Sequence, residues 1–103
     1  MTEFSILLEA RDPAKNHWRS YHIAAGRDLF DDWVVTLTYG RIGSRGRTKV
    51  VQVEDETAAR HYIRACLKKR ERAPKRIGVA YKVRYTTGRW ETGAVTVKDE
   101  TDT

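Results

Sequence analysis

The sequence predicts an α+β fold, in which a twisted antiparallel β-sheet of about five or six strands has one helix packed over it. Several short segments alternate between apolar and polar residues with the period of a strand, whereas one segment has apolar residues at helical spacing. The length of 103 residues suits one domain with a modest core. We therefore expect a single small globular unit.

The expected strands are the segments in which side-chain character alternates with a period of two. The short, proline-containing connection between the first two predicts that they form a hairpin. Residues 26–32 are predicted as a loop that leads into the third strand. The alternation is clearest over 77–85, and turn residues at 86–89 predict a second hairpin there. The predicted strands are residues 4–10, 18–23, 33–39, 48–53, 77–85 and 90–97.

The one expected helix covers residues 56–71. Its apolar residues recur every three or four positions, which places them on one face. The side chain of Asp55 or Thr57 is expected to cap its first turn, and Pro74 helps to end it. Cations cluster near its C-terminal end, where they suit the negative end of the helix dipole. The apolar face consists of Ala59, Tyr62, Ile63, Cys66 and Leu67.

A basic, glycine-punctuated loop follows the third expected strand. Gly40, Gly43 and Gly46 recur every third residue, so the backbone can turn and a ligand can approach it closely. The loop has no acidic residue until Glu54. A turn with cations and no anion predicts contact with a negatively charged partner. Its cations are Arg41, Arg45, Arg47 and Lys49.

The charge of the whole chain favours the same kind of partner. Lys and Arg number 20 against 14 Asp and Glu, and the net charge of +6 favours a polyanion such as nucleic acid. The alternative is a basic surface kept for solubility. Cys66 is the single cysteine, which excludes an internal disulfide and suits a reducing cytosol. Because no apolar run matches a membrane span or a secretory signal, we expect a cytoplasmic protein without membrane contact.

Tyr-Gly-Arg-Ile-Gly at 39–43 resembles the Trp-Gly-Arg signature of WGR domains, which occur in poly(ADP-ribose) polymerases and in several bacterial proteins. The resemblance extends over Asp-Leu-Phe-Asp-Asp-Trp at 28–33 and the helical segment to Gly-Val-Ala-Tyr at 78–81. Tyr39 stands where the family usually has Trp. The resemblance spans about residues 4–81 and implies one WGR-like domain of the stand-alone bacterial type. We expect the domain to cover residues 1–97, including an additional C-terminal hairpin, and residues 98–103 to form a flexible tail.

In poly(ADP-ribose) polymerases, the motif is part of the surface that engages the end of a broken DNA strand. By position, the resemblance implies that Tyr39 stacks on a sugar or base and that Gly40 permits close approach. It implies that Arg41 contacts phosphate or braces the loop. The alternatives are that Tyr39 ends a strand in the core and that Arg41 pairs with an acid such as Asp31 or Asp32.

A second basic cluster lies at the end of the expected helix, and we expect it to border one surface with the motif loop. Phosphate contacts from both would hold a nucleic-acid backbone without reading its sequence. The alternatives are a solvated loop tip, and helix cations that complement the dipole and aid solubility. The candidate contacts are Arg45, Arg47 and Lys49 in the loop and Lys68, Lys69 and Arg72 in the cluster, which also contains Arg70, Lys75 and Arg76.

Nothing in the sequence predicts catalysis, a metal site or a cofactor. His17, His22 and His61 lack metal-ligand spacing with one another or with Cys66, and no serine or cysteine stands in a nucleophile motif. The glycines do not have the spacing of a dinucleotide-binding loop. The tryptophans are expected to pack within the fold; they are Trp18, Trp33 and Trp90.

We therefore expect a non-catalytic nucleic-acid-binding module that holds DNA in preference to RNA, mainly through phosphates. The resemblance implies a preference for strand ends or breaks. The alternative is a protein-interaction or regulatory module whose basic face docks an acidic partner, such as a larger protein. An enzyme is the least favoured class, because no acid–base or metal constellation is visible.

Overall fold

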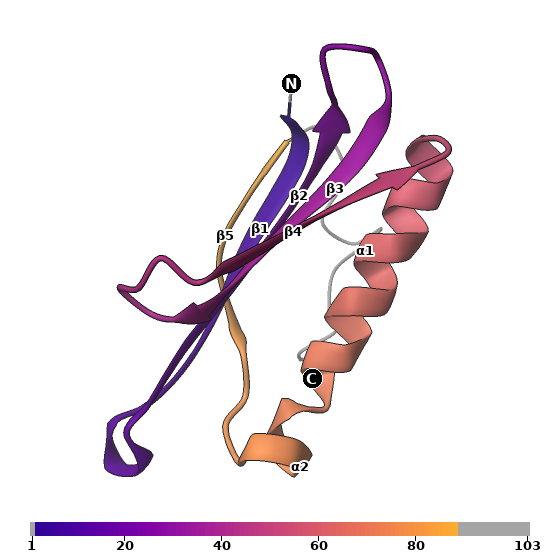
Figure 1. Cartoon of the computed structure of the whole chain (residues 1–103). Coiled ribbons are helices and arrows are strands. Elements are labelled where there is room, and N and C mark those ends of the chain that lie inside the picture. Colours follow the sequence, from indigo (N-terminus) through magenta and orange to yellow (C-terminus); the bar gives the residue numbers. More distant parts are fainter. Residues whose placement is uncertain (1, 89–103) are drawn as a thin grey trace.

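The computed structural model describes residues 2–88 of the chain (Figure 1). The elements in chain order are β1 (Thr2–Asp12), the 3-10 helix η1 (Pro13–Lys15), β2 (His17–Arg27), β3 (Trp33–Arg41), β4 (Arg47–Val53), α1 (Glu56–Glu71), α2 (Ala73–Ile77) and β5 (Lys82–Gly88). Among the described residues, no helix is long and apolar enough to cross a membrane. Within residues 2–88, no three His, Cys, Asp or Glu side chains are grouped so that they could hold a metal ion.

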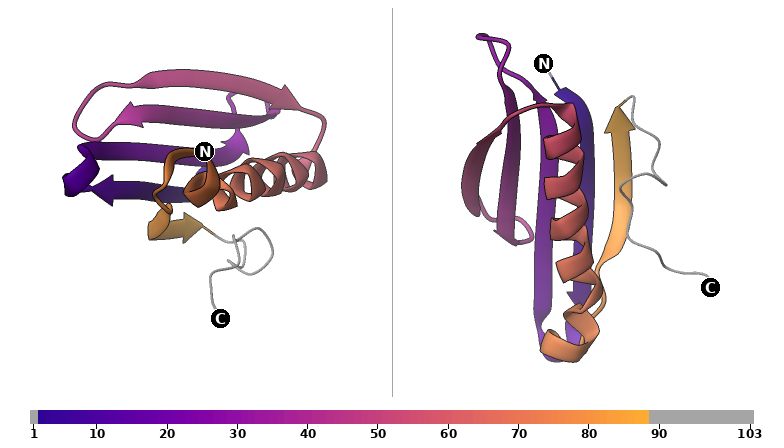
Figure 2. Two further views of the ribbon diagram at one scale, coloured as in Figure 1. Left: turned by 90° about the horizontal axis from the view of Figure 1, so that it is seen from below. Right: turned by 90° about the vertical axis from the view of Figure 1, so that its right-hand side faces the viewer.

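The strands form one antiparallel sheet in the order β4-β3-β2-β1-β5. The first four strands follow one another as a meander, so each pairs with its neighbour in sequence. α1 then runs along one face of the sheet, and β5 pairs with β1 at the edge opposite β4 (Figures 1 and 2). The predicted antiparallel sheet with one helix packed over it is confirmed.

The hydrophobic core lies between α1 and the sheet face that this helix covers. Ala59, Ile63 and Leu67 follow one another along the buried side of α1 at the predicted helical spacing. Alternate residues of the three central strands point toward them, as the period of a strand requires. The sheet residues of the core are Phe4, Ile6, Leu8, Tyr21, Ile23, Ala25, Val35 and Leu37.

Helix α1 has the predicted bounds. It begins after Asp55, whose Oδ1 accepts a hydrogen bond from the backbone N–H of Ala58 at 2.8 Å. The predicted hairpin of β1 and β2 also forms, with η1 and the left-handed Asn16 in its connection. Strands β2 and β3 are longer than predicted, because β2 continues to Arg27, within the loop predicted at 26–32, and β3 continues to Arg41 through paired backbone groups.

Replacing Asp55 with alanine is expected to lower the free energy of unfolding by about 1 kcal/mol, because a backbone N–H at the start of α1 loses its acceptor. Urea denaturation measures the change. Asp12→Ala is the control, since Asp12 stands before η1 without accepting a capping hydrogen bond. An equal loss of stability in both variants would show that charge, rather than capping, is responsible.

The segment that follows α1 differs from the prediction. The strand predicted over 77–85 is wrong for residues 77–81, because Ile77 ends α2 and Gly78 turns the chain with a φ of 78°. Pro74 lies in the first turn of α2, which begins at Ala73, instead of only ending α1, since proline suits the first turn of a helix. The turn predicted at 86–89 is wrong for residues 86–88, which pair with β1. The predicted strand at 90–97, with Trp90, and the predicted tail lie outside the described residues.

Candidate nucleic-acid interface

Tyr39 lies near the end of β3, on the sheet face that carries α1. Its side chain is 40% exposed. Its ring centroid is 6.4 Å from that of buried Tyr21, the residue directly opposite it on β2. Tyr39 is therefore anchored on the margin of the core and accessible to a ligand, so the alternative of a buried core residue is wrong.

Arg70, in the last turn of α1, covers the ring of Tyr21. The Arg70 Cζ lies 3.9 Å from the ring centroid, which is a close cation–π contact. Burial, together with the neighbouring Cys66 thiol, raises the pKa of Tyr21 above its ordinary value, so the phenol stays neutral. The Nε of Arg70 is buried without a hydrogen-bond partner in the described part of the chain. The aromatic ring of Tyr21 therefore holds this guanidinium in place. Within residues 2–88, Arg70 forms no ion pair with a carboxylate.

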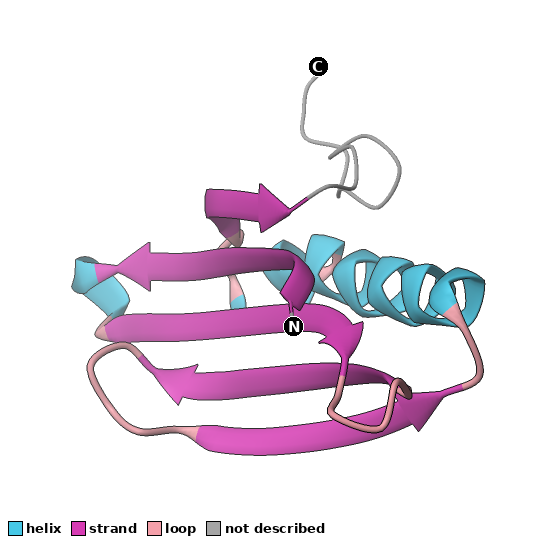
Figure 3. Cartoon of the chain, turned by 90° about the horizontal axis from the view of Figure 1, so that it is seen from above, coloured by secondary structure: helices cyan, strands magenta, loops and turns pink. Residues whose placement is uncertain are grey.

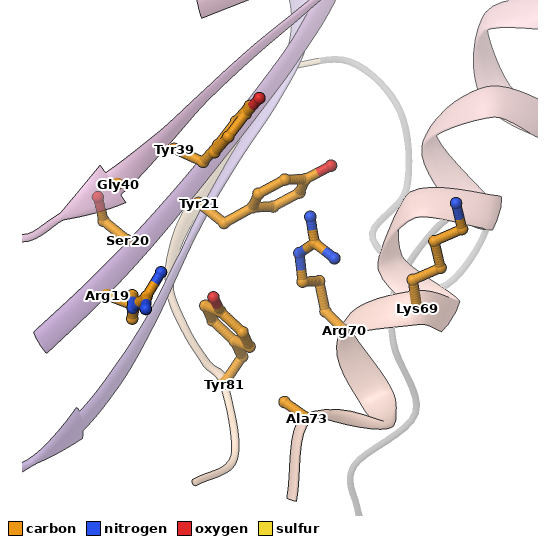
Figure 4. Close-up of a pocket in the computed structure, with 9 residues that line it drawn as sticks. All are labelled: Arg19, Ser20, Tyr21, Tyr39, Gly40, Lys69, Arg70, Ala73 and Tyr81. Carbon is orange, nitrogen blue, oxygen red and sulfur yellow. The ribbon is translucent and has the colours of Figure 1, made fainter. Parts of the chain in front are cut away.

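Two adjoining hollows open beside Tyr39. The first, which we call the Tyr39 hollow, has a volume of about 200 Å³ and lies between β2, β3 and the end of α1 (Figure 4). The second has a volume of about 310 Å³ and lies between β3, β4 and α1. Tyr39, Lys69 and Arg70 line both hollows, and none of the residues within 2–88 that line either one is acidic. The surface thus combines aromatic rings with positive charge, which suits a planar, anionic ligand.

The structure brings part of the predicted loop cations to this surface. Lys49 lines the second hollow, opposite the buried Leu37 of β3. Arg47 is paired directly across from Tyr39, so both side chains project from the same face of the sheet. Arg45 is exposed in the β3–β4 loop and lines neither hollow.

The predicted helix cations lie on different sides of α1. Lys69 follows Cys66 by three positions, and both line the second hollow. Lys68 instead follows Arg64 by one turn on the exposed side of the helix and lines neither hollow. Arg72, at the C-terminal cap of α1, is also exposed and lines neither. Of the three, only Lys69 lines the hollows that Tyr39 also lines.

Arg41 connects the end of β3 to the β1–β2 hairpin. Its Nη2 donates to Oδ1 of Asn16 at 3.3 Å, and Nε1 of Trp18 donates to the same oxygen at 3.1 Å. The alternative of an acid partner such as Asp31 is wrong, because Asp31 lies at the other end of β3 and pairs with Arg27 at 3.3 Å. In this structure Arg41 braces the neighbouring hairpin.

Gly40 and Gly46 allow the backbones on either side of the motif loop to approach one another. A Cβ at Gly40 would lie 2.9 Å from the Cα of Gly46. A Cβ at Gly46, whose φ is +71°, would lie 2.5 Å from the carbonyl oxygen of Tyr39. The close approach that Gly40 permits is therefore one between two backbone segments of this chain, at Gly40 and at Gly46.

Arg19 and Tyr81 line the Tyr39 hollow but are not among the residues predicted from sequence. Arg19 stands two positions before Tyr21 in β2, and this period-two spacing is a signal that could have placed it on the same face. Tyr81 carries no such signal, because its position depends on how the chain returns from α2 to β5. Arg70 was predicted only as a member of the basic cluster.

A model of the WGR domain family matches residues 4–74. The chain belongs to the WGR domain family. The match covers most of the residues on which the resemblance rests, although it ends before 78–81. WGR domains are modules of the nucleic-acid-binding type and form a non-catalytic family. A search of curated proteins and a search of solved structures found no match to this chain.

Proposed function

We propose that this WGR domain binds nucleic acid, with DNA as the preferred form, through the surface around Tyr39. One observation carries the proposal: an exposed aromatic ring lies among cations in hollows that no acidic residue lines. A base or sugar stacks on such a ring, and the cations hold the phosphates on either side. Contacts of this kind position a strand without reading its sequence.

The cations approach Tyr39 from several elements. Arg47 lies across from it on the neighbouring strand β4, while Lys69 and Arg70 line the same hollows from α1. Arg19 adds a guanidinium from β2. A backbone that passes over Tyr39 thus meets positive charge on both sides, which favours phosphate binding over the docking of a single carboxylate.

A preference for strand ends is part of the proposal. A base inside a duplex has both faces covered by its neighbours, whereas a terminal nucleotide leaves one face free to stack on Tyr39. The family resemblance supports the same preference, since the corresponding motif engages a broken strand in poly(ADP-ribose) polymerases.

Fluorescence anisotropy with a short labelled duplex tests this proposal. A blunt, 5′-phosphorylated duplex is compared with the same duplex sealed by hairpin caps, each at low and at moderate salt. Tighter binding to the open end would support end recognition. Equal, salt-sensitive binding to both duplexes would indicate that the protein binds phosphates without a preference for ends. An absence of binding to either duplex at low salt would overturn the proposal.

Lys69→Ala is expected to weaken binding to unrelated duplexes by similar factors and to reduce the slope of log affinity against log salt by about 1. The reason is that Lys69 lines both hollows beside Tyr39, where a phosphate contact releases a counterion. Lys68→Ala is a matched control, because it removes the same charge from the adjacent position on the exposed side of α1. If both variants lose the same affinity, the whole helix end, rather than the Tyr39 surface, binds DNA.

A further inference from the structure

The β2–β3 turn presents two apolar side chains to solvent. Leu29 is 99% exposed and Phe30 is 84% exposed. The turn projects from one end of the strands, whereas the β3–β4 loop lies at the other end (Figures 1 and 3). Adjacent large apolar residues at such exposure contribute little to folding and are typical of a contact surface.

This turn is held in one shape by its own hydrogen bonds. Oδ1 of Asp28 accepts from the backbone N–H of Phe30 at 2.9 Å and from that of Asp32 at 3.0 Å. The backbone N–H of Asp28 donates to the carbonyl of Asp32 at 2.9 Å, and that of Asp31 donates to the carbonyl of Asp28 at 3.0 Å. Because the turn is already ordered, a partner that binds Leu29 and Phe30 loses little affinity to ordering the chain.

The turn is acidic, although the chain is basic as a whole. Asp28, Asp31 and Asp32 flank the two apolar residues, and Arg27 pairs with Asp31 at 3.3 Å. Three carboxylates against one guanidinium leave a negative tip. The complement of this tip is an apolar hollow with a cationic border.

The Tyr39 hollow has these properties. Tyr39 and Tyr81 provide aromatic surface, and Arg19, Lys69 and Arg70 provide positive charge without an acid among the lining residues of the described chain. Its volume of about 200 Å³ is enough for one aromatic side chain. The tip cannot reach the hollow of its own chain, because Leu29 and Phe30 precede the start of β3 at Trp33, whereas Tyr39 of the hollow lies near the other end of β3. Only another copy can bring them together.

We infer that the tip formed by Leu29 and Phe30 docks in the Tyr39 hollow of a second copy of this chain. Phe30 packs against Tyr39 and Tyr81, and the carboxylates of the tip lie beside Lys69 and its neighbouring cations. The contact is head-to-tail, so it extends into a chain of copies or closes into a ring. A contact built on two side chains buries little area, and the association is therefore weak and dependent on concentration.

The inference goes beyond the proposed function, because it requires no nucleic acid. Sedimentation velocity of the full chain, without DNA and over about a hundredfold range of protein concentration, tests it. We expect the sedimentation coefficient to rise with concentration for the wild type and to stay at the monomer value for Phe30→Ala. Val50→Ala is the control, because it trims a side chain that is 64% exposed on β4, away from the tip, and should associate like the wild type. A wild type that remains monomeric throughout, or Phe30→Ala that associates unchanged, would overturn the inference.

A mixing experiment tests the pairing of tip with hollow. Phe30→Ala keeps its hollow and Lys69→Glu keeps its tip, so each alone should be monomeric and their mixture should form a dimer and nothing larger. Lys68→Glu makes the same charge reversal on the exposed side of α1 and should associate like the wild type. If Lys69→Glu associates like the wild type, the tip does not use this hollow. A mixture that stays monomeric would also count against the pairing.

Nucleic acid separates this inference from the proposed function. If both are correct, a short duplex displaces the tip from the hollow, and the sedimentation coefficient of the protein falls to that of a monomer bound to DNA. Assemblies that form and are unaffected by duplex would contradict the DNA proposal alone. DNA binding by a protein that never self-associates would contradict the head-to-tail contact alone.

Discussion

Ile63→Ala is expected to lower the free energy of unfolding by about 2–5 kcal/mol. Ile63 is fully buried on the face of α1 that packs on the sheet, so truncation removes apolar contacts and leaves a cavity that rigid neighbours on two sides cannot fill. A small domain is stable by only about 5–15 kcal/mol, and the loss is therefore a large share of the total.

Chemical denaturation followed by circular dichroism measures this change. Leu29→Ala is a matched control, because it removes the same number of carbon atoms from a side chain that is 99% exposed. We expect it to change stability by less than about 0.5 kcal/mol. A cost for Ile63→Ala as small as that of Leu29→Ala would mean that α1 does not pack on the sheet as described.

Tyr39→Ala is expected to weaken binding to an open duplex end by about 1–3 kcal/mol, which corresponds to roughly 5- to 150-fold in the dissociation constant. The reason is that the exposed ring supplies the stacking surface, whereas the surrounding cations remain. Binding to a duplex sealed at both ends should change less, because a sealed duplex offers no terminal base to stack.

Two conservative variants separate the ring of Tyr39 from its hydroxyl. Tyr39→Phe keeps the stacking face and should bind the open end nearly as the wild type does. Tyr39→Trp restores the usual first residue of the family motif with a larger face and should bind at least as tightly. Circular dichroism checks that each variant is folded, since Tyr39 also rests against Tyr21. Wild-type affinity of Tyr39→Ala for the open end would show that the ring is not a contact.

Local sequence patterns were sufficient to predict most of the fold. The period of two identified the first four strands, and the three-four spacing of residues such as Ala59, Ile63 and Leu67 identified α1 with its bounds. These patterns succeed because an amphipathic strand or helix must bury one face, so the burial of the core is encoded in the spacing of a few neighbouring residues. The position of the motif loop could likewise be predicted, since Gly40, Arg41 and the rest of the family signature are contiguous in the sequence.

The segment from residue 77 to 88 shows where local patterns fail. Alternation over 77–85 predicted a strand, but the chain forms α2 and turns at Gly78 before β5 begins. Residues 86–88 looked like a turn because of their composition, yet they extend β5 along β1. Pairing between β1 and β5 joins residues at the two ends of the described chain, and no short window of sequence contains that information.

The candidate site likewise has features that the sequence predicts and features that depend on the tertiary structure. The sequence by itself determined that Tyr39 is followed by a basic loop and that cations gather at the end of α1. Only the tertiary structure decided that Lys69, and not Lys68, lines the hollows next to Tyr39, because that depends on which side of the helix packs against β3. It also brought Arg19 and Tyr81 to the same hollow from distant parts of the chain. The physical reason is that periodicity records which face of an element is buried, whereas a site depends on where the packed elements place their exposed residues.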